Sequence, residues 1–78
     1  MPNGINNWQY RDVTDFLKEN GFVLNHQKGS HIFYVGIYNK TQRHVCVPFH
    51  GTVAIKPRTM KGIILQSGIP KEKWLSGK

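Results

Sequence analysis

Residues 31–47, HIFYVGIYNKTQRHVCV, predict the two neighbouring strands on which the rest of the fold is built. His31–Tyr38 is rich in Ile, Phe, Tyr and Val, the residues that favour an extended strand. Residues 39–42 predict a turn, and Arg43–Val47 predicts the next strand. That strand ends near Pro48, which has no N–H to donate to a ladder. A short turn between two strands predicts that they pair antiparallel.

The chain before this stretch predicts a helix and one more strand. Gln9–Asn20 places its apolar residues along one stripe of a helix, and the glycine that follows favours a left-handed helix end. Phe22–Gln27 predicts a strand in which Phe22 and Leu24 share an apolar face. Residues 28–30 form a tight turn into the next strand.

The chain after the strands predicts a second helix from Pro57 to about Ser67, ended by Gly68, and then a short C-terminal helix. The element order is therefore α-β-β-β-α with a short helix at the end. This order predicts an α+β, two-layer fold with an antiparallel three-stranded sheet and helices packed on one face. We expect residues 1–9 to form a flexible N-terminal arm and residues 10–78 to form a single domain.

The charge balance predicts an anionic partner. The 78 residues include 11 Lys and Arg against 4 Asp and Glu, which gives a formal net charge of +7 and a pI of about 9.9. Such a surface attracts polyanions, and charge alone leaves RNA, DNA, an acidic membrane surface and an acidic protein open. The single cysteine, Cys46, excludes an internal disulfide, and no apolar stretch reaches the length of a membrane span. We expect a cytoplasmic protein without a signal peptide and without a membrane partner.

His31 is the first catalytic candidate. It follows Gly29 and Ser30, small residues that allow a phosphate backbone to approach the start of the strand. Imidazole has a pKa of about 6.5, so it can accept or donate a proton near neutral pH, as internal cleavage of RNA requires. The alternative is a histidine at a strand end that is bonded to the backbone. His50, in the loop after Pro48, is a candidate second acid or phosphate contact, with an exposed loop histidine as the alternative.

Basic side chains predict a track for phosphates. Their contacts would add affinity without sequence specificity, and two of them lie near the start of the second helix, which attracts anions. The alternative is a solvated helix face. The candidates are Lys28, Arg43, Lys56, Arg58 and Lys61. Exposed aromatic side chains could in addition stack unpaired bases, and the candidates are Tyr34, Tyr38 and Phe49.

We predict no metal ion and no small-molecule cofactor. His44, Cys46 and His50 are the one set of residues that could gather at zinc, but they lack the paired spacing of zinc-finger ligands. Cys46 is expected to act as a small apolar residue rather than as a nucleophile.

Four short motifs in this order resemble the HicA toxin family, the mRNA-cleaving toxins of HicA–HicB toxin–antitoxin pairs. They are Gly21-Phe22, Gly29-Ser30-His31, Val47-Pro48-Phe49-His50 and Lys56-Pro57-Arg58-Thr59. The resemblance covers about residues 10–69. It implies a fold similar to a double-stranded-RNA-binding domain, ribosome-independent endoribonuclease activity on single-stranded mRNA, an essential histidine at His31 and a HicB-like antitoxin as partner.

Two other functions remain open at this point. A domain of this fold can bind RNA through shape and phosphate contacts without any chemistry, so a non-catalytic RNA-binding module is the main alternative. A DNA-binding or purely partner-binding protein is the third. The sequence shows no helix-turn-helix, because the whole sheet separates the two main helices.

Overall fold

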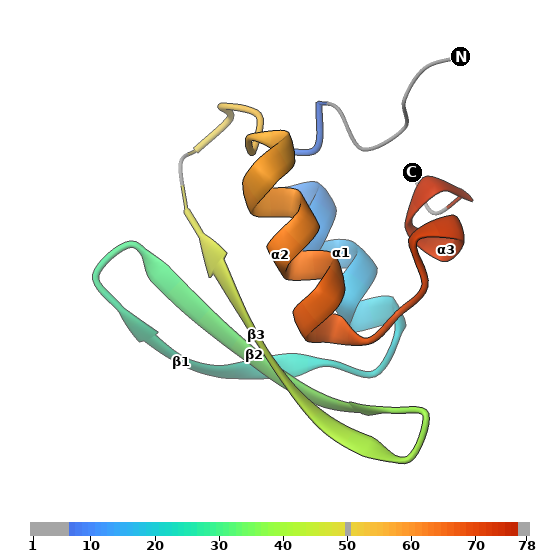
Figure 1. Ribbon diagram of the computed structural model, residues 1–78. Coiled ribbons are helices and arrows are strands. Elements are labelled where there is room, and N and C mark those ends of the chain that lie inside the picture. Colours follow the sequence, from blue (N-terminus) through green and yellow to red (C-terminus); the bar gives the residue numbers. More distant parts are fainter. Residues whose placement is uncertain (1–6, 50, 77–78) are drawn as a thin grey trace.

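The computed structural model describes residues 7–49 and 51–76. Along the chain, one helix is followed by three antiparallel strands and then by two further helices, which confirms the predicted α+β order (Figure 1). The elements are α1 (Tyr10–Glu19), β1 (Val23–Lys28), β2 (His31–Tyr38), β3 (Thr41–Pro48), α2 (Pro57–Ser67) and α3 (Lys71–Ser76). This is the α-β-β-β-α arrangement of double-stranded-RNA-binding domains.

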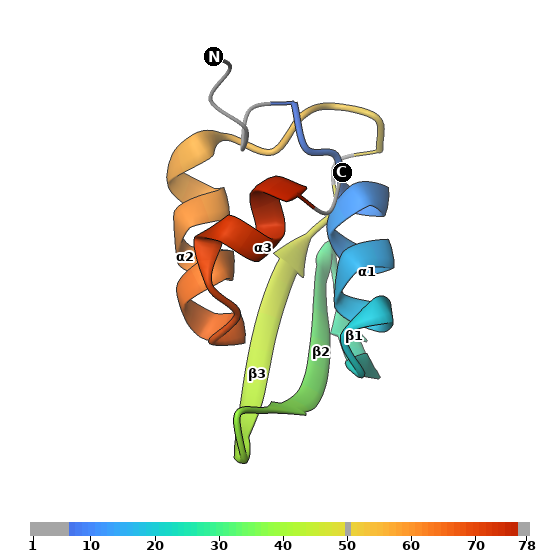
Figure 2. The same cartoon turned by 90° about the vertical axis from the view of Figure 1, so that its right-hand side faces the viewer.

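The sheet has the order β1-β2-β3, and all three helices lie on the same side of it (Figure 2). In register, Ile32 pairs with Val47 and Tyr34 with Val45, and these four side chains are buried beneath the helices. The side chains between them point to the opposite face, as the alternation of a strand requires. The core therefore lies between one face of the sheet and the helix layer.

The helix α1 ends as the sequence predicts. Gly21 has a φ of +89°, and its N–H donates to the carbonyl of Lys18 at 3.1 Å. The next N–H, that of Phe22, donates to the carbonyl of Leu17 at 2.9 Å. These two bonds form a Schellman motif, which satisfies carbonyls at the helix end and turns the chain into the sheet.

The prediction that Phe22 and Leu24 share a buried face is wrong for Leu24. Phe22 precedes β1 and is 1% exposed, whereas Leu24 is 57% exposed. The strand is at the edge of the sheet, and a β-bulge between Leu24 and His26 shifts its register against β2. Phe22 packs directly over Gly36, where an added Cβ would lie 2.7 Å from the Phe22 ring. A glycine at this point of β2 is therefore what makes room for Phe22.

Aromatic packing extends the core to both ends of the described chain. Trp8 and Trp74 are fully buried and lie edge-to-face, with ring centroids 5.4 Å apart. Phe16 of α1 contacts both rings. The N–H of Ile55 also donates to the Trp8 carbonyl at 2.7 Å. The core therefore begins before residue 10, where the sequence places the start of the domain, although residues 1–6 of the expected arm lie outside the described residues.

Candidate nucleic-acid interface

His31 opens β2 directly after a two-residue hairpin loop. Lys28 and His31 form the last pair between β1 and β2, and Gly29 in the loop has a φ of +60°. The carbonyl of Ser30 accepts a hydrogen bond of 2.7 Å from the N–H of Phe49. This bond connects the loop to the chain beyond β3 and fixes the backbone next to His31. The His31 side chain itself is exposed.

A groove of about 450 Å³ joins this end of the sheet to α2. In register, His31 pairs with Pro48, the last residue of β3, and α2 runs alongside that strand (Figure 1). The sheet contributes His31, Cys46 and Pro48 to the lining, and α2 contributes Arg58, Thr59, Gly62, Ile63 and Gln66. An imidazole and a guanidinium therefore line the same hollow.

The start of α2 adds positive potential to the groove. The helix begins at Pro57, its N-cap residue Lys56 provides no side-chain cap, and its first turn contains no acidic residue. The first backbone N–H groups of a helix lack partners within it and carry a partial positive charge. Arg58 and Thr59 lie in this turn, so the groove has the features of an anion site.

Cys46 lies in the groove as a structural residue. Its N–H donates to the side-chain oxygen of Gln66 at 3.0 Å, which links the outer edge of β3 to α2. Burial raises the pKa of the Cys46 thiol, so the thiol stays protonated near neutral pH. A protonated thiol is a poor nucleophile and a poor metal ligand.

Comparison with known protein families now identifies the kind of protein. Residues 10–69 match the family model of the HicA toxin of bacterial toxin–antitoxin systems. The chain belongs to the HicA toxin family. It is therefore the toxin of a toxin–antitoxin system, and its family comprises RNA-directed nucleases that are paired with HicB antitoxins. A search of curated proteins found no match to this HicA-family chain.

Three of the five predicted RNA-binding cations lie at or beside the groove of this HicA-family toxin. Arg58 is part of its lining, and Lys28 is the cross-strand partner of His31. Lys56 lines a second hollow, which shares Pro48 and Thr59 with the first. These three cations are therefore gathered at the end of the sheet at which His31 lies.

Arg43 lies elsewhere. It pairs with Gly36, five residues along β3 from Pro48, so it belongs to the opposite end of the sheet. Its guanidinium lies against Gly68, where an added Cβ would be 2.5 Å from the guanidinium carbon, and its Nε donates to the Tyr38 carbonyl at 3.5 Å. Arg43 is thus a packing residue in this fold rather than a neighbour of His31.

Lys61 is also separated from the groove. It lines a third hollow beside Leu65 and Pro70, near the end of α2 and the start of α3. Lys61 follows Arg58 by three residues on α2, but it does not line the groove. The residues that share the groove with Arg58 are instead Thr59, Gly62 and Gln66, at spacings of three and four, which sequence reasoning missed. Helical periodicity counted from Thr59 is the signal that could have found them.

The other histidines do not form a metal cluster in the part of the chain that the structure describes. His44 and Cys46 are two residues apart on β3, and no third His, Cys, Asp or Glu from residues 7–49 or 51–76 joins them. His26 stacks on Phe33, with ring centroids 4.4 Å apart. His50, the candidate second acid, lies outside the described residues.

Aromatic candidates for base stacking differ in exposure. Tyr34 is buried in the core, and Tyr38 is partly buried against it. Phe49 is exposed and contacts Tyr10 edge-to-face at 5.0 Å. Phe49 is therefore the one exposed ring of these three.

Charge is strongly segregated along the chain. The acidic residues are Asp12, Asp15, Glu19 and Glu72, so residues 20–71 contain none. The strands, the groove and α2 all fall within that range, where lysine and arginine meet no carboxylate side chain from the same segment. Among the described residues, no helix is long and apolar enough to cross a membrane.

Proposed function

We propose that this HicA-family toxin is an endoribonuclease that cleaves mRNA in the cytoplasm without a metal ion and without the ribosome, with His31 as its catalytic residue. The observation that carries the proposal is the groove that His31 lines together with Arg58 and the positive start of α2. A phosphate bound by the cations would present its neighbouring ribose to the imidazole.

The chemistry is an internal transfer. The ribose 2′-oxygen attacks the adjacent phosphorus, the bond between phosphorus and the 5′-oxygen breaks, and a cyclic phosphate and a free 5′-hydroxyl result. One group removes the 2′-hydroxyl proton and another protonates the leaving 5′-oxygen. The His31 imidazole performs one of these transfers, which contributes about 10²- to 10⁴-fold in rate. Arg58 stabilises the charge that develops on the phosphate oxygens, and His50 remains the candidate for the other transfer.

The test is cleavage of a long single-stranded RNA by purified protein, with EDTA present and ribosomes absent. We expect the parent protein to cut and His31→Ala to lose at least 100-fold in rate, the lower limit for one acid or base. His44→Ala is the matched control, because His44 is another exposed histidine of the sheet that does not line the groove. Circular dichroism of each variant verifies the fold.

Two outcomes would contradict the proposal. If activity disappears with EDTA and returns with a divalent ion, the reaction is not metal-independent. If neither parent nor His31→Ala cuts, yet both retard RNA equally on a gel, the protein is an RNA-binding module of the same fold without chemistry.

A HicB-like antitoxin is proposed to inhibit the toxin by covering the groove with an acidic surface. The net charge of +7 and the absence of acidic residues between Glu19 and Glu72 favour such a partner. In the complex, His31 should be protected from acylation by diethylpyrocarbonate, while His44 stays reactive unless the partner reaches it. Full reactivity of His31 in the complex would exclude this mode of inhibition.

A further inference from the structure

A second hollow, of about 500 Å³, lies beside the His31 groove at the end of β3. Its lining consists of Pro48, Val53, Ala54, Ile55, Lys56 and Thr59. Pro48 and Thr59 also line the His31 groove, so the two hollows are adjacent. Its volume is within the range of about 300–1,000 Å³ that is usual for ligand pockets.

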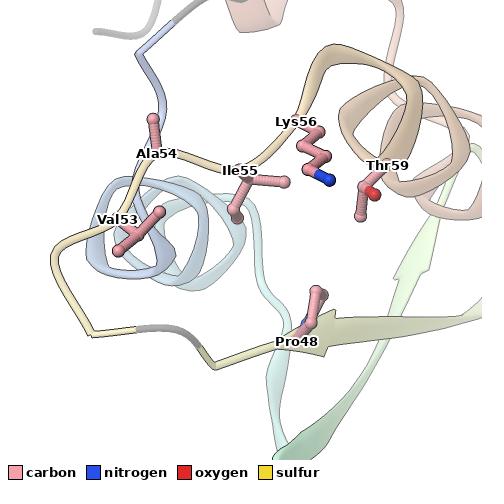
Figure 3. A pocket seen from close by; sticks show the side chains of 6 residues that line it. All are labelled: Pro48, Val53, Ala54, Ile55, Lys56 and Thr59. Atoms are coloured by element: carbon pink, nitrogen blue, oxygen red, sulfur yellow. The ribbon is translucent and has the colours of Figure 1, made fainter.

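The walls of this pocket suit a flat apolar ligand that carries a negative charge at its edge. Figure 3 shows Pro48 on one side and Ile55, Lys56 and Thr59 on the opposite side. Four of the six lining residues are apolar, while the ammonium of Lys56 and the hydroxyl of Thr59 provide one cation and one hydrogen-bonding group. A nucleobase has apolar faces, polar edges and an attached phosphate, and it matches all of these groups.

The pocket is firmly built on its inner side and open on its outer side. Ile55 is buried, and its N–H is bonded to the carbonyl of Trp8, so this wall is fixed to the core. Val53 is 65% exposed and forms the outer wall. A base can therefore enter from solvent and pack between a rigid and an accessible surface.

We propose that this pocket binds the unpaired base of a nucleotide next to the phosphate that is cleaved. The inference rests on the proposed function, which supplies RNA as the ligand. With its phosphate between Lys56 and Arg58, the nucleotide spans from the pocket to the His31 groove through the shared residues Pro48 and Thr59. A base in a duplex has both faces stacked and cannot enter, so the pocket selects RNA that is single-stranded at the cut.

Binding of short RNA provides the test. In the His31→Ala background, which keeps the RNA intact, dissociation constants are measured by fluorescence anisotropy for a single-stranded oligomer. They are measured again for the same oligomer with one abasic nucleotide at each position in turn. Loss of a bound base should weaken binding about 5-fold at one position, the lower end of the range for one base–aromatic stack because this pocket offers no aromatic ring, and much less elsewhere.

A matched pair of variants connects that position to the pocket. Val53→Ser removes the apolar outer wall, and Val23→Ser makes the same change on β1, where the valine is 60% exposed and distant in the sequence from the pocket. With Val53→Ser, the penalty for the abasic nucleotide should shrink at least threefold. With Val23→Ser, it should stay as in the background protein.

The possible failures are distinguishable. If the parent protein cleaves RNA but the abasic penalty is the same with Val53→Ser and Val23→Ser, the base pocket is wrong and the nuclease proposal stands. An abasic scan without any sensitive position leads to the same conclusion. If the parent neither cleaves nor binds RNA, the proposed function itself fails, and the pocket falls with it.

Discussion

Gly62 lowers the stability of α2 at its position. Replacing it should therefore change the free energy of unfolding and the activity in different directions. It lies in the middle of α2, where glycine is less favourable than alanine by about 0.5–1 kcal/mol. No heavy atom lies within 4 Å of the place that a Cβ would occupy, so packing does not require a glycine there. The residue does line the His31 groove, and this is where an added side chain would project.

We therefore expect Gly62→Ala to raise the free energy of unfolding by about 0.5–1 kcal/mol, because it lowers the conformational freedom of the unfolded chain. For a domain of this size, 1 kcal/mol corresponds to a rise in Tm of about 4–8 °C. Gly62→Leu should be close to alanine in helix propensity, but its larger side chain enters the groove. It should lower kcat/KM for RNA about tenfold or more, since displacement of a substrate by 1 Å can cost ~100-fold in rate.

The assay combines urea denaturation with cleavage of a single-stranded RNA for both variants. Leu65→Ala is the control, because Leu65 lies on α2 outside the groove and is highly exposed. A Gly62→Leu protein that is stable and fully active would refute the assignment of this groove to RNA. A Gly62→Ala protein that is less stable than the parent would refute the energetic argument.

Three further predictions concern the fold that supports the groove. Burial and a hydrogen bond with a neighbouring tyrosine raise the pKa of Tyr10 from 10.0 to about 12. Since the folded state then holds the proton more tightly than the unfolded state, the free energy of unfolding should fall as the pH rises from 10 to 12. Urea denaturation across that range should show a smaller decrease in the free energy of unfolding for Tyr10→Phe than for the parent protein. An equal decrease would contradict the raised pKa of Tyr10. Gly36→Ala should destabilise the protein by about 1–3 kcal/mol in the same assay, because the added Cβ would clash with Phe22. An unchanged urea midpoint would show that the sheet accommodates the methyl group without cost. Trp74→Ala should lower the free energy of unfolding by about 3–5 kcal/mol, since it empties a fully buried site, whereas Leu75→Ala beside it should cost far less. A loss for Trp74→Ala no larger than the loss for Leu75→Ala would contradict this argument from burial.

Local signals in the sequence predicted most of the elements. The β-rich run from His31 predicts the observed bounds of β2, and Pro57 and Gly68 mark both ends of α2. Gly21 predicts the turn out of α1. Each of these residues acts through its own backbone preference, so its effect can be derived without knowledge of distant contacts.

Features that depend on distant contacts were not predicted. Trp8 precedes every periodic segment, and it is buried because Trp74, far away in the sequence, packs against it. Arg43 is basic like the other candidates for phosphate binding, but the strand register places it at the opposite end of the sheet from His31. The part that Gly62 plays in the groove likewise depends on how α2 is rotated against β3. These are consequences of tertiary packing, and one strand or helix taken alone does not contain them.

The segregation of charge distinguishes α1, which has two cations against three carboxylates, from the rest of the molecule. Three of the four carboxylate side chains belong to α1, whereas α2 and the sheet carry only cations. If the groove binds RNA as proposed, the field of this polyanion should turn the molecule before contact and favour encounters in which the cationic side leads. Because this field decays over about 8 Å at physiological ionic strength, added salt should slow the capture of RNA more than it slows any step that follows capture. On the proposed function, the orientation of the toxin toward RNA depends on where its few acidic residues lie as much as on where its basic residues lie.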